Sequence, residues 1–250
     1  MGAVDPRYHD PVLGVVFDLD GTLVESPHDF DRMRREVIRI AERSGVVPGH
    51  LSIRQTIPSL LDEALRELER GGAREGVRFR FEAEATQALD AIELEALSRT
   101  TARAGAVDLL DGLAARGYRL GVLTRSSATF AREALRRTGL QPFVRAIRSR
   151  TDSGPAKPDP KALLLLLEAL GVPPDRAVSV GDHLLDAECA ARARVRFYAV
   201  LPVRSGELGT DVERFRAAGA AAVAPDLGAI GRQLGLAGPS APPSAAESRK

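Results

Sequence analysis

Short apolar runs that end in polar residues recur along the chain. The first covers residues 12–17 and ends at Asp18. A continuous apolar run of this length is typical of a strand buried on both faces of a parallel sheet. Similar runs predict further strands over residues 118–123, 143–147, 177–180, 196–201 and 220–223.

Segments with a helical spacing of apolar residues lie between these strands. They predict helices over residues 107–116, 127–137, 160–170 and 184–193. Strand and helix thus alternate from residue 107 onward, which predicts an α/β fold built on a doubly wound parallel sheet. Ligands of such sheets bind beyond the carboxyl ends of the strands, so polar residues at those ends are candidates for function.

Residues 25–104 break the alternation. Apolar residues in this stretch follow helical spacing, and no strand pattern occurs among them. We therefore predict a small α-helical cap over residues 25–104, inserted into a core domain of residues 1–24 and 105–236. Because the insertion follows the first polar loop, it would lie above that loop like a lid. The three predicted helices begin near Phe30, Ile57 and Phe81.

Charge and cysteine content exclude several classes of protein. The 250 residues include 35 basic and 34 acidic side chains, for a formal net charge of +1. This balance gives no broad electrostatic field for nucleic acid or an anionic membrane. The single cysteine, Cys189, excludes a disulfide framework and a cysteine-based zinc site, and its Ala-rich surroundings predict an inert buried thiol.

The chain shows no pattern of a targeting or membrane segment. Residues 1–11 contain charged side chains and no long apolar stretch, unlike a secretory signal peptide. The longest apolar run, within residues 162–170, is shorter than the roughly 18 residues of a membrane span. We therefore expect a cytoplasmic protein without membrane contact. Residues 237–250 are rich in Gly, Pro, Ser and Ala and predict a disordered tail.

Asp18 and Asp20 follow the first predicted strand and are the first candidates for chemistry. Adjacent carboxylates repel each other unless a cation lies between them or one holds a proton. Carboxylate oxygens suit Mg²⁺, and the backbone N–H groups of Gly21 and Thr22 can meet an anion. The alternative is a pair of aspartates that serves turns and helix caps, which is common for an isolated Asp-x-Asp-Gly.

Three later features have the same ambiguity when each is taken alone. Thr124 is either a hydroxyl ligand at a strand end or a helix cap. Lys157, one of only three lysines among the 35 basic residues, is either a phosphate ligand or a solvated side chain. Gly181 and Asp182 end a strand, and Asp186 lies one helical turn further on the same face. Turns, helix caps and solvated side chains can each explain one of these residues. They do not explain why all of them lie at predicted strand ends or in the adjoining loops.

In order along the chain, these features resemble the four motifs of the haloacid dehalogenase superfamily, specifically of its phosphatases. They are DLDGTL at residues 18–23, Thr124, Lys157 and GDHLLD at residues 181–186. The insertion is similar to the helical cap of the phosphoglycolate phosphatase-like branch of the superfamily.

The resemblance implies a role for each motif residue. Asp18 would be the catalytic nucleophile and Asp20 the general acid and base, while Thr124 and Lys157 would bind the phosphoryl oxygens. A carboxylate attacks a phosphate dianion only weakly, so a cation and Lys157 must offset the charge repulsion. Dehalogenases of the superfamily lack an Asp two residues after the nucleophile, so Asp20 favours phosphate chemistry.

The resemblance also implies a Mg²⁺ cofactor. Asp18, the main-chain carbonyl of Asp20 and Asp182 would bind the ion. Asp186 and Gly181 would not bind the ion directly but would stabilise the position of its ligands or of Lys157.

Two residues beside the motifs differ from many relatives. Arg125 follows Thr124 where Asn is frequent, and His183 replaces a frequent Ser. Arg125 either contacts an anion of the substrate or is solvated. Arg32, Arg34 and Arg35 of the predicted cap either recognise the leaving group or form a charged outer helix face.

The sequence thus predicts a Mg²⁺-dependent phosphomonoester hydrolase that acts on a small phosphorylated metabolite through an aspartyl-phosphate intermediate. It is expected to be a monomer or homodimer. Three alternatives stay open: a sugar-phosphate mutase of the same superfamily, a phospho-accepting signalling receiver and a non-catalytic binding module. A receiver would be about half this length and would retain its phosphoryl group, so Asp20 and the inserted lid argue against it.

Overall fold

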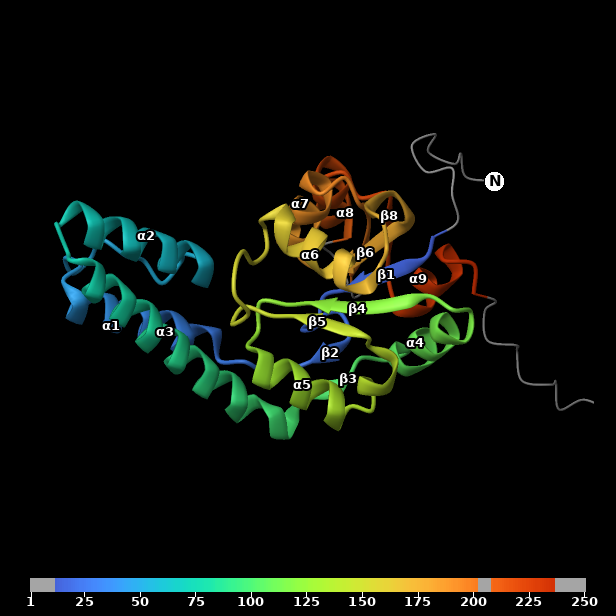
Figure 1. The fold of residues 1–250 in the computed structure, drawn as a ribbon, viewed down its shortest axis with the longest axis horizontal. Coiled ribbons are helices and arrows are strands. Elements are labelled where there is room, and N and C mark those ends of the chain that lie inside the picture. Colours follow the sequence, from blue (N-terminus) through green and yellow to red (C-terminus); the bar gives the residue numbers. More distant parts are fainter. Residues whose placement is uncertain (1–11, 202–207, 237–250) are drawn as a thin grey trace, which may run out of the picture.

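A six-stranded parallel sheet forms the centre of the computed structural model, which describes residues 12–201 and 208–236 (Figure 1). The strand order is β5-β4-β1-β6-β7-β8, and every neighbouring pair is parallel. The predicted α/β fold with a doubly wound sheet is confirmed. The strands are β1 (Gly14–Phe17), β4 (Arg119–Leu123), β5 (Ala146–Arg148), β6 (Ala177–Gly181), β7 (Arg196–Val200) and β8 (Ala222–Ala224).

Helices cover both faces of this sheet because side chains alternate between the faces along each strand. Val15 and Phe17 of β1 point into one apolar core, and Val16 points into the other. Burial of each such side chain stabilises the fold by roughly 1.5–3 kcal/mol. The first core includes α4 (Ala106–Ala115), α5 (Ala128–Arg137) and α9 (Leu227–Gln233), and the second includes α6 (Pro160–Leu170), α7 (Leu184–Arg192) and α8 (Leu208–Ala217).

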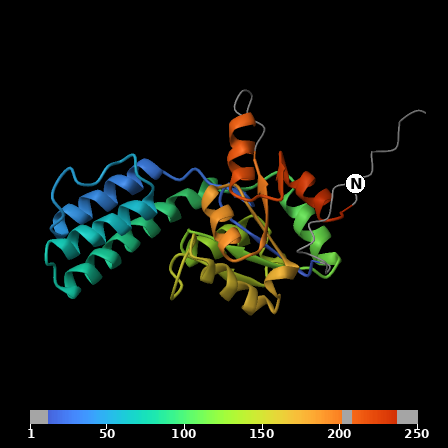
Figure 2. The same ribbon diagram turned by 90° about the horizontal axis from the view of Figure 1, so that it is seen from above.

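Three further helices extend away from the sheet and form the helical insertion (Figures 1 and 2). They share a separate apolar core that includes Met33, Leu60 and Phe81. The chain leaves the sheet through β2 (Val24–Glu25) and returns through β3 (Thr101–Ala102), and these two strands pair in antiparallel fashion. The helices are α1 (Phe30–Ser44), α2 (Ile57–Arg70) and α3 (Glu75–Ala96).

Several helices begin at a side chain that satisfies a free backbone N–H group. The carboxylate of Asp29 accepts from the N–H of Arg32 at 2.8 Å, and the hydroxyl of Ser127 accepts from the N–H of Phe130 at 3.2 Å. Such caps are worth about 1 kcal/mol each. Asp159 caps α6 in the same way, so the loop that carries Lys157 is fixed where that helix begins.

Some elements differ from the prediction in their ends or were not predicted. Strand β5 begins at Ala146, later than expected, because residues 141–143 with Pro142 form a 3₁₀ turn. The two-residue strands β2 and β3 are too short to produce a sequence pattern, and α8 and α9 were not predicted either. Within the described residues, no helix is both long and apolar enough to cross a membrane. Residues 1–11 and the predicted tail, residues 237–250, lie outside the described chain.

Candidate active site

The carboxyl ends of three neighbouring strands bring the predicted site residues together. Asp18 follows β1, Thr124 follows β4 and Asp182 follows β6, and β1 lies between the other two strands. Lys157 reaches the same place from the loop before α6. These residues line one cavity of about 580 Å³, which also reaches Met33 of the helical insertion.

Lys157 is buried between two carboxylates rather than solvated. Its side chain is 4% exposed, and its Nζ contacts Asp18 Oδ1 and lies 2.6 Å from Asp186 Oδ1. Burial alone would lower the pKa of Lys157, but the two carboxylates outweigh this effect and raise the pKa. The site therefore contains a permanent, compact positive charge directly beside Asp18.

Three carboxylates lie close together beside Lys157. Oxygens of Asp18, Asp182 and Asp186 lie within 4.8 Å of one another. Burial and the neighbouring carboxylates raise the pKa of Asp18 well above its usual range, although Lys157 opposes this. The pKa of Asp182 is also raised, by burial and by Asp186. One lysine cannot neutralise three carboxylates, so the group has an excess of negative charge. Its oxygen atoms are the ligands that a hard divalent cation such as Mg²⁺ prefers.

Neighbouring groups fix the orientation of Asp182 and Asp186. The hydroxyl of Thr22 donates to Asp182 Oδ1 at 2.9 Å. The backbone N–H of His183 donates to Asp186 Oδ2 at 3.1 Å, and His183 Nδ1 accepts from the N–H of Leu185 at 3.1 Å. His183 therefore caps α7 and holds Asp186 where it meets Lys157.

Asp20 lies in a less charged part of the cavity. Burial raises its pKa to about 7, while hydrogen bonding from Ser26 opposes the rise. Its Oδ1 is buried and has no hydrogen-bond partner within the described chain. A carboxyl group that titrates near neutral pH can both donate and accept a proton, as general acid–base catalysis requires.

His28 is a neighbour of Asp20 that the sequence analysis missed. Its side chain is 2% exposed, and its Nε2 lies 3.5 Å from Asp20 Oδ2. Burial lowers the pKa of His28 to about 4, so the ring is neutral near pH 7 and the contact is not an ion pair. The ring packs against Phe30 and Phe130, and nothing in its sequence surroundings marks it as part of the site.

Two glycines allow the carboxylates to approach the backbone. Gly21 has a φ of +86°, and a Cβ at this residue would overlap the carboxylate of Asp182. A Cβ at Gly181 would overlap Asp186 in the same way. The glycines of both motifs are therefore required by the packing of the carboxylates.

We expect Gly21→Ala to lower the free energy of unfolding by about 2–3 kcal/mol and to reduce the phosphatase activity that the sequence predicts, because it adds both backbone strain and an overlap with Asp182. Urea unfolding and phosphate release measure the two effects. Gly117→Ala is a matched control, since Gly117 has a φ of +82° but no atom within 4 Å of a built Cβ. Equal losses of stability and activity in both variants would contradict the role assigned to the overlap.

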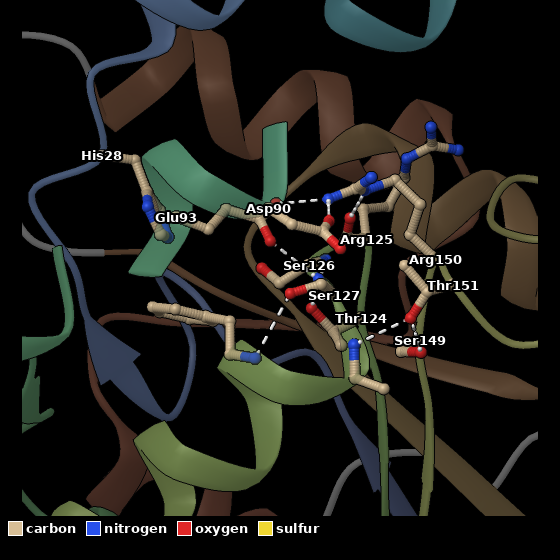
Figure 3. A network of polar contacts seen from close by, with 12 residues as sticks. His28, Asp90, Glu93, Thr124, Arg125, Ser126, Ser127, Ser149, Arg150 and Thr151 are labelled. Carbon is tan, nitrogen blue, oxygen red and sulfur yellow. Dashed lines mark hydrogen bonds and ion pairs between the residues drawn. The ribbon is translucent and has the colours of Figure 1, made fainter. Parts of the chain in front are cut away.

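A polar network connects the loops that follow β4 and β5 to α3 (Figure 3). Glu93 of α3 accepts from the N–H of Ser127 at 2.8 Å and from Arg150 at 2.9 Å, and Arg150 also binds Asp90 at 2.8 Å. The sequence analysis identified Arg125, which lines the cavity, but missed Glu93 and Arg150. Glu93 does carry a signal: it is a charged residue on the buried apolar face of α3.

Most of the predicted cap arginines do not face the cavity. Arg34 lines it and pairs with Asp31 at 2.8 Å, whereas Arg35 is exposed and Arg32 pairs with Glu95 at 2.6 Å on the surface. Cys189 is buried, and burial raises the pKa of its thiol to about 11.

Comparison with known proteins places these residues in context. The family described as haloacid dehalogenase-like hydrolase matches residues 12–194. The chain is 31% identical to a phosphoglycolate phosphatase of Rhodospirillum rubrum over 90% of this chain and 92% of the relative. It is 28% identical to an N-acetylmuramic acid 6-phosphate phosphatase of Pseudomonas aeruginosa, over 74% and 80% of the two chains. A haloacid dehalogenase-like hydrolase from Bacteroides fragilis has the same fold, with a TM-score of 0.62, 24% identity and coverage of 88% and 99%.

Proposed function

Because the chain belongs to the haloacid dehalogenase-like hydrolase family and is a phosphatase of that family, we propose that it hydrolyses a small phosphomonoester through an aspartyl-phosphate at Asp18, with Mg²⁺ as cofactor. The buried contact between Lys157 and Asp18 carries this proposal, because it places a fixed positive charge at the attacking carboxylate. The cavity of about 580 Å³ has the size of a small-molecule site.

Phosphoryl transfer begins with attack of an Asp18 oxygen on phosphorus and departure of the ester oxygen. Lys157 offsets the repulsion between the carboxylate and the phosphate dianion and holds a phosphoryl oxygen. The backbone N–H of Ser126 donates to Thr124 Oγ1 at 3.0 Å, which leaves the hydroxyl proton of Thr124 free to donate to a second phosphoryl oxygen.

Asp20 donates a proton in the first half-reaction and accepts one in the second. It gives a proton to the departing ester oxygen, which leaves as an alcohol. It then takes a proton from the water that attacks phosphorus in the aspartyl-phosphate, and the Asp18 carboxylate is released together with inorganic phosphate. A pKa of about 7 for Asp20 suits this alternation near neutral pH.

Asp18, the main-chain carbonyl of Asp20 and Asp182 would hold the Mg²⁺ ion. When bound, the ion supplies positive charge to the phosphoryl oxygens during transfer. Asp186, fixed by Lys157 and the N–H of His183, orients the lysine toward Asp18.

The helical insertion forms the far wall of the cavity, and we assign residues 25–104 to a cap. Met33 and Leu89 from the insertion line the cavity opposite the sheet edge. Apolar walls exclude water from the transfer step and select leaving groups by shape.

A panel of phosphomonoesters assayed with Mg²⁺ and with excess EDTA tests the proposal. We expect release of inorganic phosphate from at least one small ester, and loss of the reaction in EDTA. Formation of an isomeric sugar phosphate instead of free phosphate would favour a mutase. A stable phosphoprotein without turnover would favour a receiver, and absence of any reaction would favour a binding module.

A further inference from the structure

Two arginines from different loops line the cavity and contact each other. Arg125 follows Thr124 directly, and Arg150 follows β5. Arg150 Nε donates to the main-chain carbonyl of Arg125 at 2.9 Å, and a guanidinium N–H of Arg125 donates to the main-chain carbonyl of Lys157. Arg125 is thereby held beside both Thr124 and Lys157, the two residues assigned to the phosphoryl group.

The two arginines differ in how their charges are balanced. The guanidinium of Arg150 is shared by Asp90 and Glu93, and its side chain is 10% exposed. Figure 3 shows this guanidinium aimed at the two carboxylates, whereas that of Arg125 is aimed away from them. Among the described residues, no carboxylate oxygen lies within 4.0 Å of the Arg125 guanidinium. The remaining cavity arginine, Arg34, is paired with Asp31.

This arrangement leaves an unbalanced positive charge in a partly buried position. Burial and the charge of Arg150 lower the pKa of Arg125, and the more distant Asp62 only partly opposes this. A buried charge without a partner is costly, and an anion placed against it would remove that cost. The Nε and second Nη of Arg125 have no partner within the described chain, so one edge of the guanidinium is free for a two-oxygen contact.

We propose that Arg125 binds a second anionic group of the substrate, a carboxylate or a second phosphoryl group carried on the leaving-group side. This inference rests on the proposed function, because Thr124 and Lys157 are taken to hold the phosphoryl group that is transferred. Arg125 is bonded to the main chain of Lys157 and lines the same cavity as Lys157 and Thr124, so we expect the two anionic groups to lie within one short substrate. The preferred substrates are therefore short phosphomonoesters with two anionic groups.

Three compounds that differ in one group test the inference. 2-Hydroxyethyl phosphate has a neutral end, phosphoglycolate has a carboxylate there, and ethylene glycol bisphosphate has a second phosphoryl group. We expect kcat/KM to be higher for at least one of the charged compounds than for the neutral one. Arg125→Gln should lower that preference by about tenfold to a hundredfold, the usual effect of losing a hydrogen bond between charged groups. The neutral compound should lose less, only as much as the loss of the contact between Arg125 and the Lys157 carbonyl costs all three compounds.

Two further variants sharpen the test. Arg125→Lys should retain part of the preference, since it keeps the charge but loses the planar two-point contact. Arg137→Gln makes the same change as Arg125→Gln on the exposed side of α5, where Arg137 pairs with Glu133, and should leave the preference unchanged.

The outcomes separate this inference from the proposed function. Hydrolysis of all three compounds without a charge preference, or a preference that survives Arg125→Gln, overturns the inference alone. An equal loss for all three compounds in Arg125→Gln also overturns it, because Arg125 would then serve the transferred group. Calorimetric affinities of the Asp18→Asn protein for the three compounds give a readout without turnover, and equal affinities overturn the inference. Absence of Mg²⁺-dependent hydrolysis of any phosphomonoester overturns the proposed function itself.

Discussion

Asp18→Asn is expected to lower kcat by at least about a thousandfold, because an amide oxygen cannot replace the carboxylate as the attacking group. The fold should persist. Asn has the same shape and can still accept from Lys157, and it removes one of three buried carboxylates that repel each other. The melting temperature should therefore be equal to that of the unmodified protein or higher, as is common when a strained catalytic group is neutralised.

Phosphate release and thermal unfolding measure the two parts of this prediction. Asp175→Asn, the same change at an exposed residue before β6, should alter neither activity nor melting temperature. Near-normal turnover by the Asp18→Asn protein would remove Asp18 from the role of nucleophile. A large loss of stability would show instead that the Asp18 carboxylate is needed to neutralise Lys157.

Lys157→Arg is expected to lower kcat by roughly a hundredfold although the charge is kept, because the two cations differ in shape. The ammonium group of Lys157 is enclosed between Asp18 and Asp186. A longer, planar guanidinium cannot take the same position without moving one carboxylate, and it would spread its charge away from the attacking oxygen.

Lys161→Arg provides the matched control, because Lys161 lies four residues after Lys157, in the helix that follows the loop. Lys161 is exposed in the first turn of α6, so the same change there should leave kcat within about twofold of its original value, as for most surface substitutions. Full activity in Lys157→Arg would show that catalysis needs only a positive charge at this position. The presence of a lysine there, in a chain with few lysines, would then have no functional meaning.

The position of the candidate site could be predicted because most of its residues follow the carboxyl ends of strands. Asp18, Thr124 and Asp182 each follow a short apolar run, and the parallel sheet then brings them to one edge. The family inferred from these motifs is confirmed by the match over residues 12–194 and by the relatives. The catalytic roles of the residues stay predictions.

Contacts between distant segments could not be predicted in the same way. Glu93 and Arg150 are 57 positions apart, and their ion pair depends on how α3 packs beside α5 and the loop that follows β5. His28 lies in an irregular segment without a periodic pattern and meets Asp20 only after β2 has turned the chain. Alternation and helical spacing report which face of an element is buried, but they do not report which elements face each other.

The short ribbon of β2 and β3 also bears on how proteins of this architecture diverge. Val24 pairs with Ala102 and Glu25 with Thr101, so the two ends of the helical insertion are hydrogen-bonded neighbours. The entropy of closing a loop rises only slowly with its length, so a segment held at such a junction can be lengthened, shortened or exchanged without displacing the strands beside it. The helical insertion can thus be exchanged as one unit while Asp18, Asp182 and Lys157 keep their positions at the edge of the sheet.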